Sequence, residues 1–149
     1  MKTTPLYLSL GSNMGNRREN LLCAIDLLTS FLCLEPAALS SIIETKSWGF
    51  EGGDFLNCAI RYDIPEAGQD PCLYLHSLLH SFQEIERILG RKEKSVLTPE
   101  GGHLYHDRPI DIDILYYGEI HIDSPELQIP HPFIQQRPFV TQPLREIWI

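Results

Sequence analysis

The sequence predicts an α+β fold with the element order βαββαβ, the split βαβ or ferredoxin-like pattern. In this pattern a mostly antiparallel sheet carries both helices on one face and leaves the other face for a site. Two observations predict it. Four segments have apolar residues at alternating positions, which is typical of half-buried strands. Two longer segments have apolar residues three or four positions apart, as helices do, and they follow the first and third strand segments.

The first half of the chain is expected to form one strand, one helix and two further strands. Residues 5–10, P-L-Y-L-S-L, alternate and end at Gly11, where a turn is expected to close the strand. Asn16, with a glutamate three residues later, resembles a helix start, and leucine and isoleucine then recur with helical spacing. Residues 38–44 and 55–63 are expected to be the second and third strands.

The second half is expected to begin with a helix and to return to the sheet. Asp70, followed by proline, resembles an N-cap with proline at the first helical position. One apolar stripe follows and ends at Gly90. Residues 110–117 are the expected fourth strand, and a short hairpin near 118–123 and a proline-rich terminal region come after it.

Alternation gives each expected strand a helix-facing side and an opposite side. The opposite side should carry Tyr7, Ser9, Phe55, Asn57, Arg61, Asp111 and Asp113. Asn57 and the two aspartates should therefore share the uncovered face of one sheet, where a site could be built. Two glycine-containing loops, 45–54 and 90–107, are long enough to close over a ligand.

The composition indicates a globular protein that is expected to form a single domain over residues 1–149. Acidic residues outnumber basic ones by 20 to 12, which argues against nucleic acid as a partner but not against a small anionic ligand. No apolar run approaches the ~20 residues that span a bilayer, so no membrane partner is expected. The four cysteines form no C-x-x-C pair and indicate a reducing compartment, the cytoplasm.

Asp111 and Asp113 admit two interpretations. Their side chains point to the same face of a strand, roughly 6–7 Å apart. They are either part of a solvated face or a site for a divalent cation, because a bound Mg²⁺ removes the repulsion between two carboxylates. Mg²⁺ typically takes one or two carboxylates and fills its other positions with water and substrate phosphates, and Arg108 could complement phosphate charge.

A flat heterocycle is the second kind of ligand that the pattern suggests. Phe55 is expected on the uncovered face beside Asn57, so a ring could stack there while the Asn57 amide supplies a donor and an acceptor. Trp48 lies in a glycine-rich loop, where core packing is not the expected role of an aromatic side chain.

Eight short blocks follow one another along the chain: L-G-S-N at 10–13, D-F-L-N at 54–57, Q-E-I-E at 83–86, L-G-R at 89–91, R-P-I-D-I-D-I-L at 108–115, I-P-H-P at 129–132, R-P-F at 137–139 and P-L-R-E-I at 143–147. In this order they resemble the motifs of the 6-hydroxymethyl-7,8-dihydropterin pyrophosphokinase family of the folate pathway. The block at 108–115 resembles the signature of that family.

The resemblance implies a Mg²⁺- and ATP-dependent transfer of pyrophosphate to the pterin hydroxymethyl group, with release of AMP. Asp111 and Asp113 would bind two Mg²⁺ ions, and together with Arg91 and Arg108 they would form the catalytic group. Residues facing ATP would be Gln83, Glu86, Arg91, Arg108, Ile114, His131 and Arg137. The pterin pocket would comprise Thr45, Trp48, Phe55, Asn57 and Phe139, with Phe55 and Phe139 on either side of the ring.

This chain departs from the family pattern at several positions. Tyr105 is the aromatic residue nearest the signature arginine, where relatives often carry tryptophan. The preceding loop is longer and offers Lys92 and Lys94 as its basic residues. Glu126 replaces a basic residue often found upstream of I-P-H, which would remove one phosphate contact.

A second hypothesis is a non-catalytic nucleotide- or small-ligand-binding module, because ferredoxin-like folds often serve as binding domains. The discriminating feature is the pair Asp111 and Asp113, which a pure binding module has no need to place on an open face. The partners expected are ATP and a reduced hydroxymethylpterin. A monomer is expected, although the sequence leaves the oligomeric state open.

Overall fold

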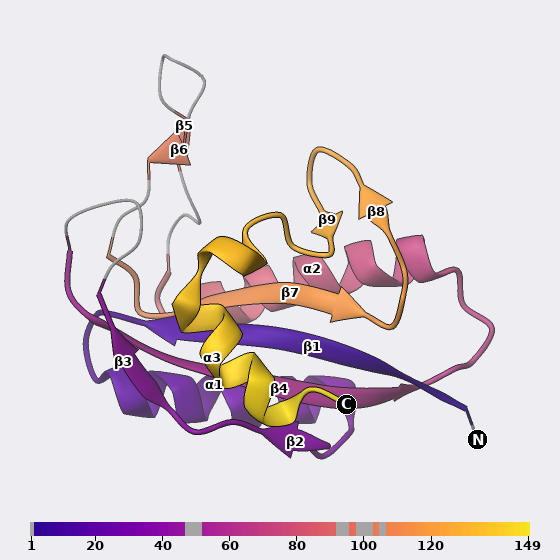
Figure 1. Ribbon diagram of the computed structural model, residues 1–149, viewed down its shortest axis with the longest axis horizontal. Coiled ribbons are helices and arrows are strands. Elements are labelled where there is room, and N and C mark those ends of the chain that lie inside the picture. Colours follow the sequence, from indigo (N-terminus) through magenta and orange to yellow (C-terminus); the bar gives the residue numbers. More distant parts are fainter. Residues whose placement is uncertain (1, 47–51, 92–95, 98–102, 105–106) are drawn as a thin grey trace.

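The computed structural model describes residues 2–46, 52–91, 96–97, 103–104 and 107–149 (Figure 1). Its long elements are β1 (Thr3–Ser12), α1 (Arg17–Leu32), β4 (Phe55–Pro65), α2 (Pro71–Ile88), β7 (Asp111–Tyr117) and α3 (Pro138–Ile147). The short elements are β2 (Ala38–Leu39), β3 (Ile43–Thr45), β5 (Val96–Leu97), β6 (His103–Leu104), β8 (Ile122–Asp123), β9 (Gln128–Ile129) and the 3₁₀ turn η1 (Ile134–Gln136).

The central sheet is antiparallel, with β1 between β4 and β7 and with the short strands β2 and β3 both paired to β4 (Figure 1). Apolar side chains oppose one another across these strands: Leu8 lies opposite Ile60 of β4 and opposite Ile114 of β7. The predicted α+β class with an antiparallel sheet is therefore confirmed.

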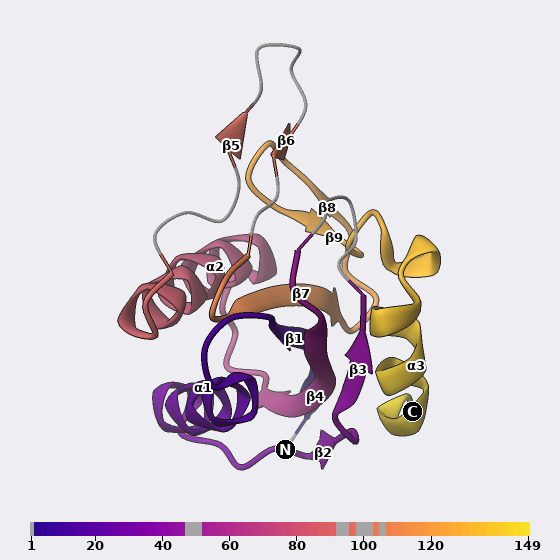
Figure 2. The same ribbon diagram turned by 90° about the vertical axis from the view of Figure 1, so that its left-hand side faces the viewer.

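Helices α1 and α2 cover one face of the sheet, as predicted (Figure 2). The side chain of Asn16 accepts a hydrogen bond from the Glu19 backbone N–H (3.1 Å), and that of Asp70 accepts one from the Cys72 N–H (2.9 Å), so both predicted caps are confirmed. The core beneath the helices includes Leu6, Leu8, Leu10, Leu21, Leu28, Ile60, Tyr62, Leu75, Phe82 and Ile112. Burying each such side chain contributes about 1.5–3 kcal/mol, so this layer stabilises the sheet.

The strand expected at 38–44 is interrupted. The pairing register with β4 shifts by one residue across the gap, from Leu39 opposite Ile60 to Ile43 opposite Asn57. Ser40 lies at the shift, where its hydroxyl accepts a hydrogen bond from the Ala59 N–H (2.8 Å). The serine hydroxyl replaces a backbone carbonyl as the acceptor for this N–H group. The alternation of apolar residues does not predict such a side-chain contact.

A third helix, α3, packs against the opposite face of the sheet (Figure 2). Its buried side chains Val140, Leu144 and Ile147 form a second core with Tyr7, Ala59 and Leu115. The opposite face is therefore partly covered rather than open along its whole length. The sequence did not predict α3 because Pro143 lies inside it, and an internal proline normally argues against a helix.

Two further details differ from expectation. The hairpin expected near 118–123 lies further along, where β8 pairs with β9 and Ile122 is opposite Ile129. Gly118, with a φ of 54°, forms the turn that leaves β7. Within the segment 90–107, expected to be a loop, the short strands β5 and β6 pair with each other.

None of the helices in the described residues is both long and apolar enough to cross a membrane.

We expect the cysteines to differ in reactivity. Burial raises the pKa of the Cys58 thiol to about 12, so at pH 8 this thiol is protonated and unreactive. Cys33 and Cys72 are exposed. Alkylation of the folded protein at pH 8, read by peptide mass spectrometry, should label these two residues and spare Cys58 until denaturant is added. Labelling of Cys58 at the rate of Cys72 in the folded protein would contradict this.

Candidate active site

The two aspartates of β7 lie on the sheet face opposite α1 and α2. Ile112 and Ile114 belong to the core beneath the helices, so Asp111 and Asp113 point the other way. Their side chains are only 16% and 14% exposed. The strand register places Gly11 beside Asp111, and Asn57 beside Gly11, so one row crosses three strands. The predicted shared face of Asn57 and the aspartates is thus confirmed.

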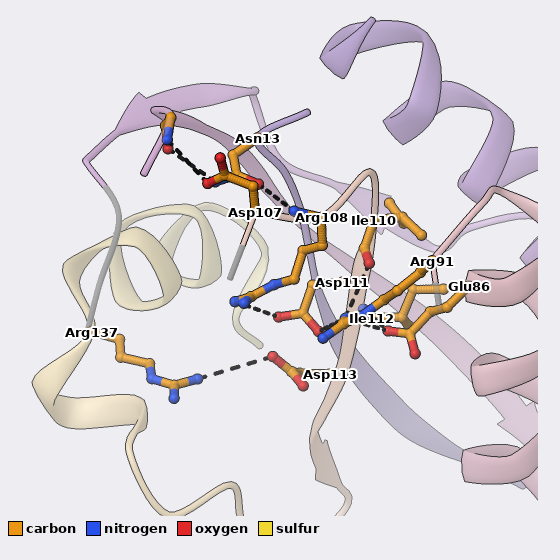
Figure 3. Close-up of polar contacts among 11 residues, drawn as sticks. Asn13, Glu86, Arg91, Asp107, Arg108, Ile110, Asp111, Ile112, Asp113 and Arg137 are labelled. Atoms are coloured by element: carbon orange, nitrogen blue, oxygen red, sulfur yellow. Dashed lines mark hydrogen bonds and ion pairs between the residues drawn. The ribbon is translucent and has the colours of Figure 1, made fainter. Parts of the chain in front are cut away.

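Three buried arginines surround the two carboxylates (Figure 3). Arg91 Nη1 donates to Asp111 Oδ1 at 2.8 Å, and Arg108 Nη2 lies 3.5 Å from Asp111 Oδ2. Arg137 Nη1 lies 4.0 Å from Asp113 Oδ2. Opposite charges at these distances attract strongly where water is scarce. The arginines explain why two negative charges one residue apart are tolerated here.

Glu86 supports this arrangement from the last turns of α2. Its Oε2 accepts hydrogen bonds from the Ile112 backbone N–H (2.8 Å) and from Arg91 Nη1 (3.2 Å). Arg91 Nη1 also donates to the carbonyl oxygen of Ile110 (3.1 Å). The Glu86 and Arg91 side chains are 4% and 3% exposed, and buried ionised groups require such partners. These contacts attach the end of α2 to the strand that carries the aspartates.

Gly11 keeps the middle of the row open. A Cβ atom at this position would lie 3.0 Å from Asn57 Oδ1 and 3.2 Å from Phe55 Cδ1, so a side chain would displace both. Asn57 Nδ2 donates to Thr45 Oγ1 at 2.8 Å, which orients the amide. The Arg108 guanidinium carbon lies 5.1 Å from the centre of the Phe55 ring. Three residues predicted for one pocket, Thr45, Phe55 and Asn57, therefore lie together.

A cavity of about 190 Å³ adjoins Asp113. It is lined by Leu79, Ile112, Asp113, Ile114, Glu126, Leu127, Gln128, His131 and Pro132. Two of these residues, Ile114 and His131, are among those predicted to face ATP. Glu126 lies within 3.6 Å of His80 Nε2, so this departure from the family pattern places a negative charge among the lining residues. An apolar wall with a few polar groups is typical of small-molecule sites.

The start of α3 brings a further cation and aromatic rings to the same face. Arg137 directly precedes the helix, and its guanidinium carbon lies 5.3 Å from the centre of the Phe133 ring and 5.7 Å from that of Phe139. Cation–π contacts of this kind contribute about 0.5–2 kcal/mol. Arg137 and Phe139, predicted for ATP and pterin respectively, are therefore neighbours.

The donor set suits a hard divalent cation such as Mg²⁺. Asp111 and Asp113 supply carboxylate oxygens, which are the ligands that Mg²⁺ prefers. Within the described part of the chain, no group of three or more His, Cys, Asp or Glu side chains could hold a metal ion. The two aspartates are thus an incomplete ligand set, and such a set fits a metal whose other ligands come from water and phosphates.

Gln83 and Trp48 are the remaining predicted site residues. Gln83 is half-buried on α2, one turn before Glu86, and Trp48 lies outside the described residues.

Sequence reasoning took Gly11 as the end of the strand, but β1 continues to Ser12 and Gly11 lies within it. A glycine inside an alternating strand often marks a close approach, and that signal could have revealed its position between Asn57 and Asp111.

Comparisons with known proteins agree with this geometry. Residues 7–149 match the model of a family described as 7,8-dihydro-6-hydroxymethylpterin-pyrophosphokinase. A 2-amino-4-hydroxy-6-hydroxymethyldihydropteridine pyrophosphokinase of Porphyromonas gingivalis is 42% identical over 144 residues, covering 95% of this chain and 89% of the relative. The protein of the same name from Aquifex aeolicus is 38% identical, covering 95% and 79%. A folate synthesis bifunctional protein of Arabidopsis thaliana is 36% identical over 95% of this chain and 26% of the relative.

The buried ion pairs lead to a prediction about stability. Arg91→Met would remove the cationic partner of a buried glutamate, so we expect a loss of about 3–5 kcal/mol in the free energy of unfolding. Urea denaturation followed by circular dichroism would measure it. Arg87→Met is the matched control, because Arg87 is exposed on the same helix end and pairs with Glu84 at the surface. Its loss should be about 0–1 kcal/mol, and equal losses for both variants would contradict the prediction.

Proposed function

Because this chain belongs to the 7,8-dihydro-6-hydroxymethylpterin-pyrophosphokinase family, we propose that the pyrophosphate transfer it catalyses takes place on the sheet face between Asn57 and Asp113. The reaction moves pyrophosphate from ATP to the hydroxymethyl group of the reduced pterin and yields the pterin diphosphate and AMP, a step in folate biosynthesis. The observation that supports this location is the row Asp111–Gly11–Asn57, which joins the acidic pair to the aromatic and amide pocket without an intervening side chain.

Asp111 and Asp113 would hold the two Mg²⁺ ions that accompany ATP. When bound, such ions neutralise phosphate charge and lower the pKa of a coordinated hydroxyl group. The chain itself supplies the orientation, because Arg91 and Glu86 fix Asp111 and the β7 backbone from behind. The side chains of both aspartates lie on the same face of β7.

The arginines are proposed to contact the phosphates. Arg108 and Arg137 lie 3.5 and 4.0 Å from their carboxylates, so each can exchange a carboxylate for a phosphate oxygen when the aspartates bind metal. Arg91 is more firmly fixed through Glu86 and the Ile110 carbonyl. We propose that Arg91 faces ATP from this fixed position and, with Glu86, also orients Asp111.

The cavity beside Asp113 is proposed to receive part of the nucleotide. Ile114 offers an apolar surface, and His131 contributes a polar ring at the same cavity. Gln83, one turn from Glu86 on α2, is proposed for the nucleotide side as well. A cavity of about 190 Å³ suits a ring of the nucleotide rather than the whole molecule.

The pterin is proposed to bind at the other end of the row. Asn57 would read the edge of the ring, because Thr45 orients its amide. Phe55 and Phe139 would flank the ring, and Trp48 is proposed to complete the pocket. The hydroxymethyl group would then point past Gly11 towards the metal side. Positioning and charge neutralisation supply most of the catalysis in such transfers, so a dedicated general base is not required.

Three broader expectations remain proposals. We propose that residues 1–149 act as one catalytic domain and that the protein is a monomer. We also propose a cytoplasmic location, which the four free cysteines support because disulfides are rare in reducing compartments. The alternative of a non-catalytic binding module does not account for the acidic pair and its three arginines.

Asp113→Asn tests the proposed chemistry. Asp113 has a looser contact with its arginine than Asp111, so this variant should fold while losing a metal ligand. We expect AMP formation from Mg·ATP and the reduced hydroxymethylpterin to fall roughly 10²–10³-fold, which corresponds to several kcal/mol of transition-state stabilisation. Asp123→Asn, at an exposed aspartate of β8, is the control and should retain wild-type activity. Undiminished AMP formation by Asp113→Asn would reject the assignment.

Gly11→Ala tests the location of the pterin. A methyl group here would lie 3.0 Å from Asn57 Oδ1 and 3.2 Å from the Phe55 ring, so it should displace both. Titration calorimetry should show pterin affinity reduced at least tenfold, while the affinity for a non-hydrolysable ATP analogue changes less than threefold. Gly68→Ala is a control for glycine replacement away from the site: an added Cβ would meet no atom within 4 Å, but the φ of 77° disfavours alanine, so this variant should lose stability while both affinities stay unchanged. Equal losses for both ligands would place the pterin elsewhere.

A further inference from the structure

Four residues from three separate segments meet at the end of the sheet, and we call them the loop junction: Asn13, Gly53, Asp107 and Arg108. Asp107 Oδ1 accepts a hydrogen bond from Asn13 Nδ2 at 2.7 Å and another from the Gly53 backbone N–H at 3.1 Å. One carboxylate oxygen therefore joins the segment before β7 to the segments after β1 and before β4.

Asn13 closes the loop junction on its other side. Its Nδ2 also donates to the Gly53 carbonyl (3.1 Å), and its Oδ1 accepts a hydrogen bond from the Arg108 N–H (2.8 Å). The Asn13 N–H donates to the Arg108 carbonyl (3.2 Å). A Cβ atom on Gly53 would lie 3.0 Å from the Asn13 carbonyl oxygen, so the two backbones are in close contact. Asn13 itself is buried.

The loop junction lies where the two proposed subsites meet. Phe55, at the pterin end, comes two residues after Gly53, and Arg108, at the phosphate end, directly follows Asp107. The Arg108 side chain extends from the junction to Asp111, as Figure 3 shows, and also contacts the Phe55 ring at 5.1 Å. Asp107 is thus covalently adjacent to the arginine that contacts both Phe55 and Asp111.

We propose that Asp107 is a positioning residue through which occupation of the nucleotide subsite strengthens pterin binding, and the reverse. This inference rests on the proposed function, because it assigns Arg108 to the phosphates and Phe55 to the pterin. Phosphate contacts that order Arg108 also order the adjacent Asp107, and Asp107 then fixes Gly53 and the entry to Phe55. The second substrate consequently meets a subsite that is already ordered, which is positive coupling between two sites.

The coupling can be measured directly. Titration calorimetry gives the dissociation constant of the reduced hydroxymethylpterin without and with saturating Mg²⁺ and a non-hydrolysable ATP analogue, and the ratio of the two constants is the coupling factor. Such factors are typically about 5–150. We expect Asp107→Ala to lower the coupling factor at least fivefold. Asp107→Asn should retain most of it, because the amide oxygen can accept the same two hydrogen bonds. Thermal unfolding would confirm that both variants are folded.

Arg17→Met is the matched control. Arg17 Nη1 donates to the Asp54 carbonyl (3.0 Å) and pairs with Glu44 (2.7 Å), so it holds the same segment before Phe55. Within the part of the chain that the structure describes, Arg17 makes no hydrogen bond or ion pair with Arg108 or Asp107, so it anchors the segment without joining the two subsites. We expect this variant to weaken pterin binding equally with and without the nucleotide analogue, leaving the coupling factor at its wild-type value.

Three results would overturn the inference. They are a wild-type coupling factor near one, an unchanged factor in Asp107→Ala, and a factor lowered as much by Arg17→Met or Asp107→Asn as by Asp107→Ala. Failure of the proposed function is distinguishable from these, because the wild-type protein would then form no AMP from Mg·ATP and the pterin. A protein that forms AMP with an Asp107-independent coupling factor would retain its function and refute only the role of Asp107.

Discussion

Mutual neutralisation of carboxylates and guanidinium groups around β7 is the constraint on which the site depends. Asp111, Asp113 and Glu86 are matched by Arg91, Arg108 and Arg137, all at least half-buried. Removing one partner of such a set leaves a charge that is costly to bury, by several kcal/mol. The set also draws on α2, β7 and the residue before α3, so elements distant in the sequence must all be in place for the charges to balance.

Features with a local cause could be predicted from the sequence. Alternation along a strand determines which face Asp111 and Asp113 occupy. Asn16 and Asp70 are predictable as caps because their side chains can accept hydrogen bonds from the first N–H groups of the helix that follows. The shared face of Asn57 and the aspartates followed from alternation together with the order of the elements. The family resemblance then supplied roles for these positions, and the family itself was confirmed by the comparisons.

Features with a non-local cause could not be predicted. The row from Asn57 through Gly11 to Asp111 depends on strand register, which is set by pairing between distant segments. The burial of Glu86 and Arg91 depends on how the end of α2 meets β7, whereas helical spacing alone marks Glu86 as an ordinary polar flank. Pro143 disfavours a helix locally, yet it lies inside α3. This helix is stabilised by packing on the apolar side chains that it covers.

The position of α3 in the chain has a consequence for biosynthesis. A ribosome adds roughly 5–20 residues per second, so β1 and β4 are synthesised several seconds before α3. Tyr7 of β1 and Ala59 of β4 are therefore made well before the apolar side chains of α3 that cover them. Docking of this one late helix both shields that apolar surface and brings Arg137 to Asp113, so the chain segment made last closes the second core and completes the charge set.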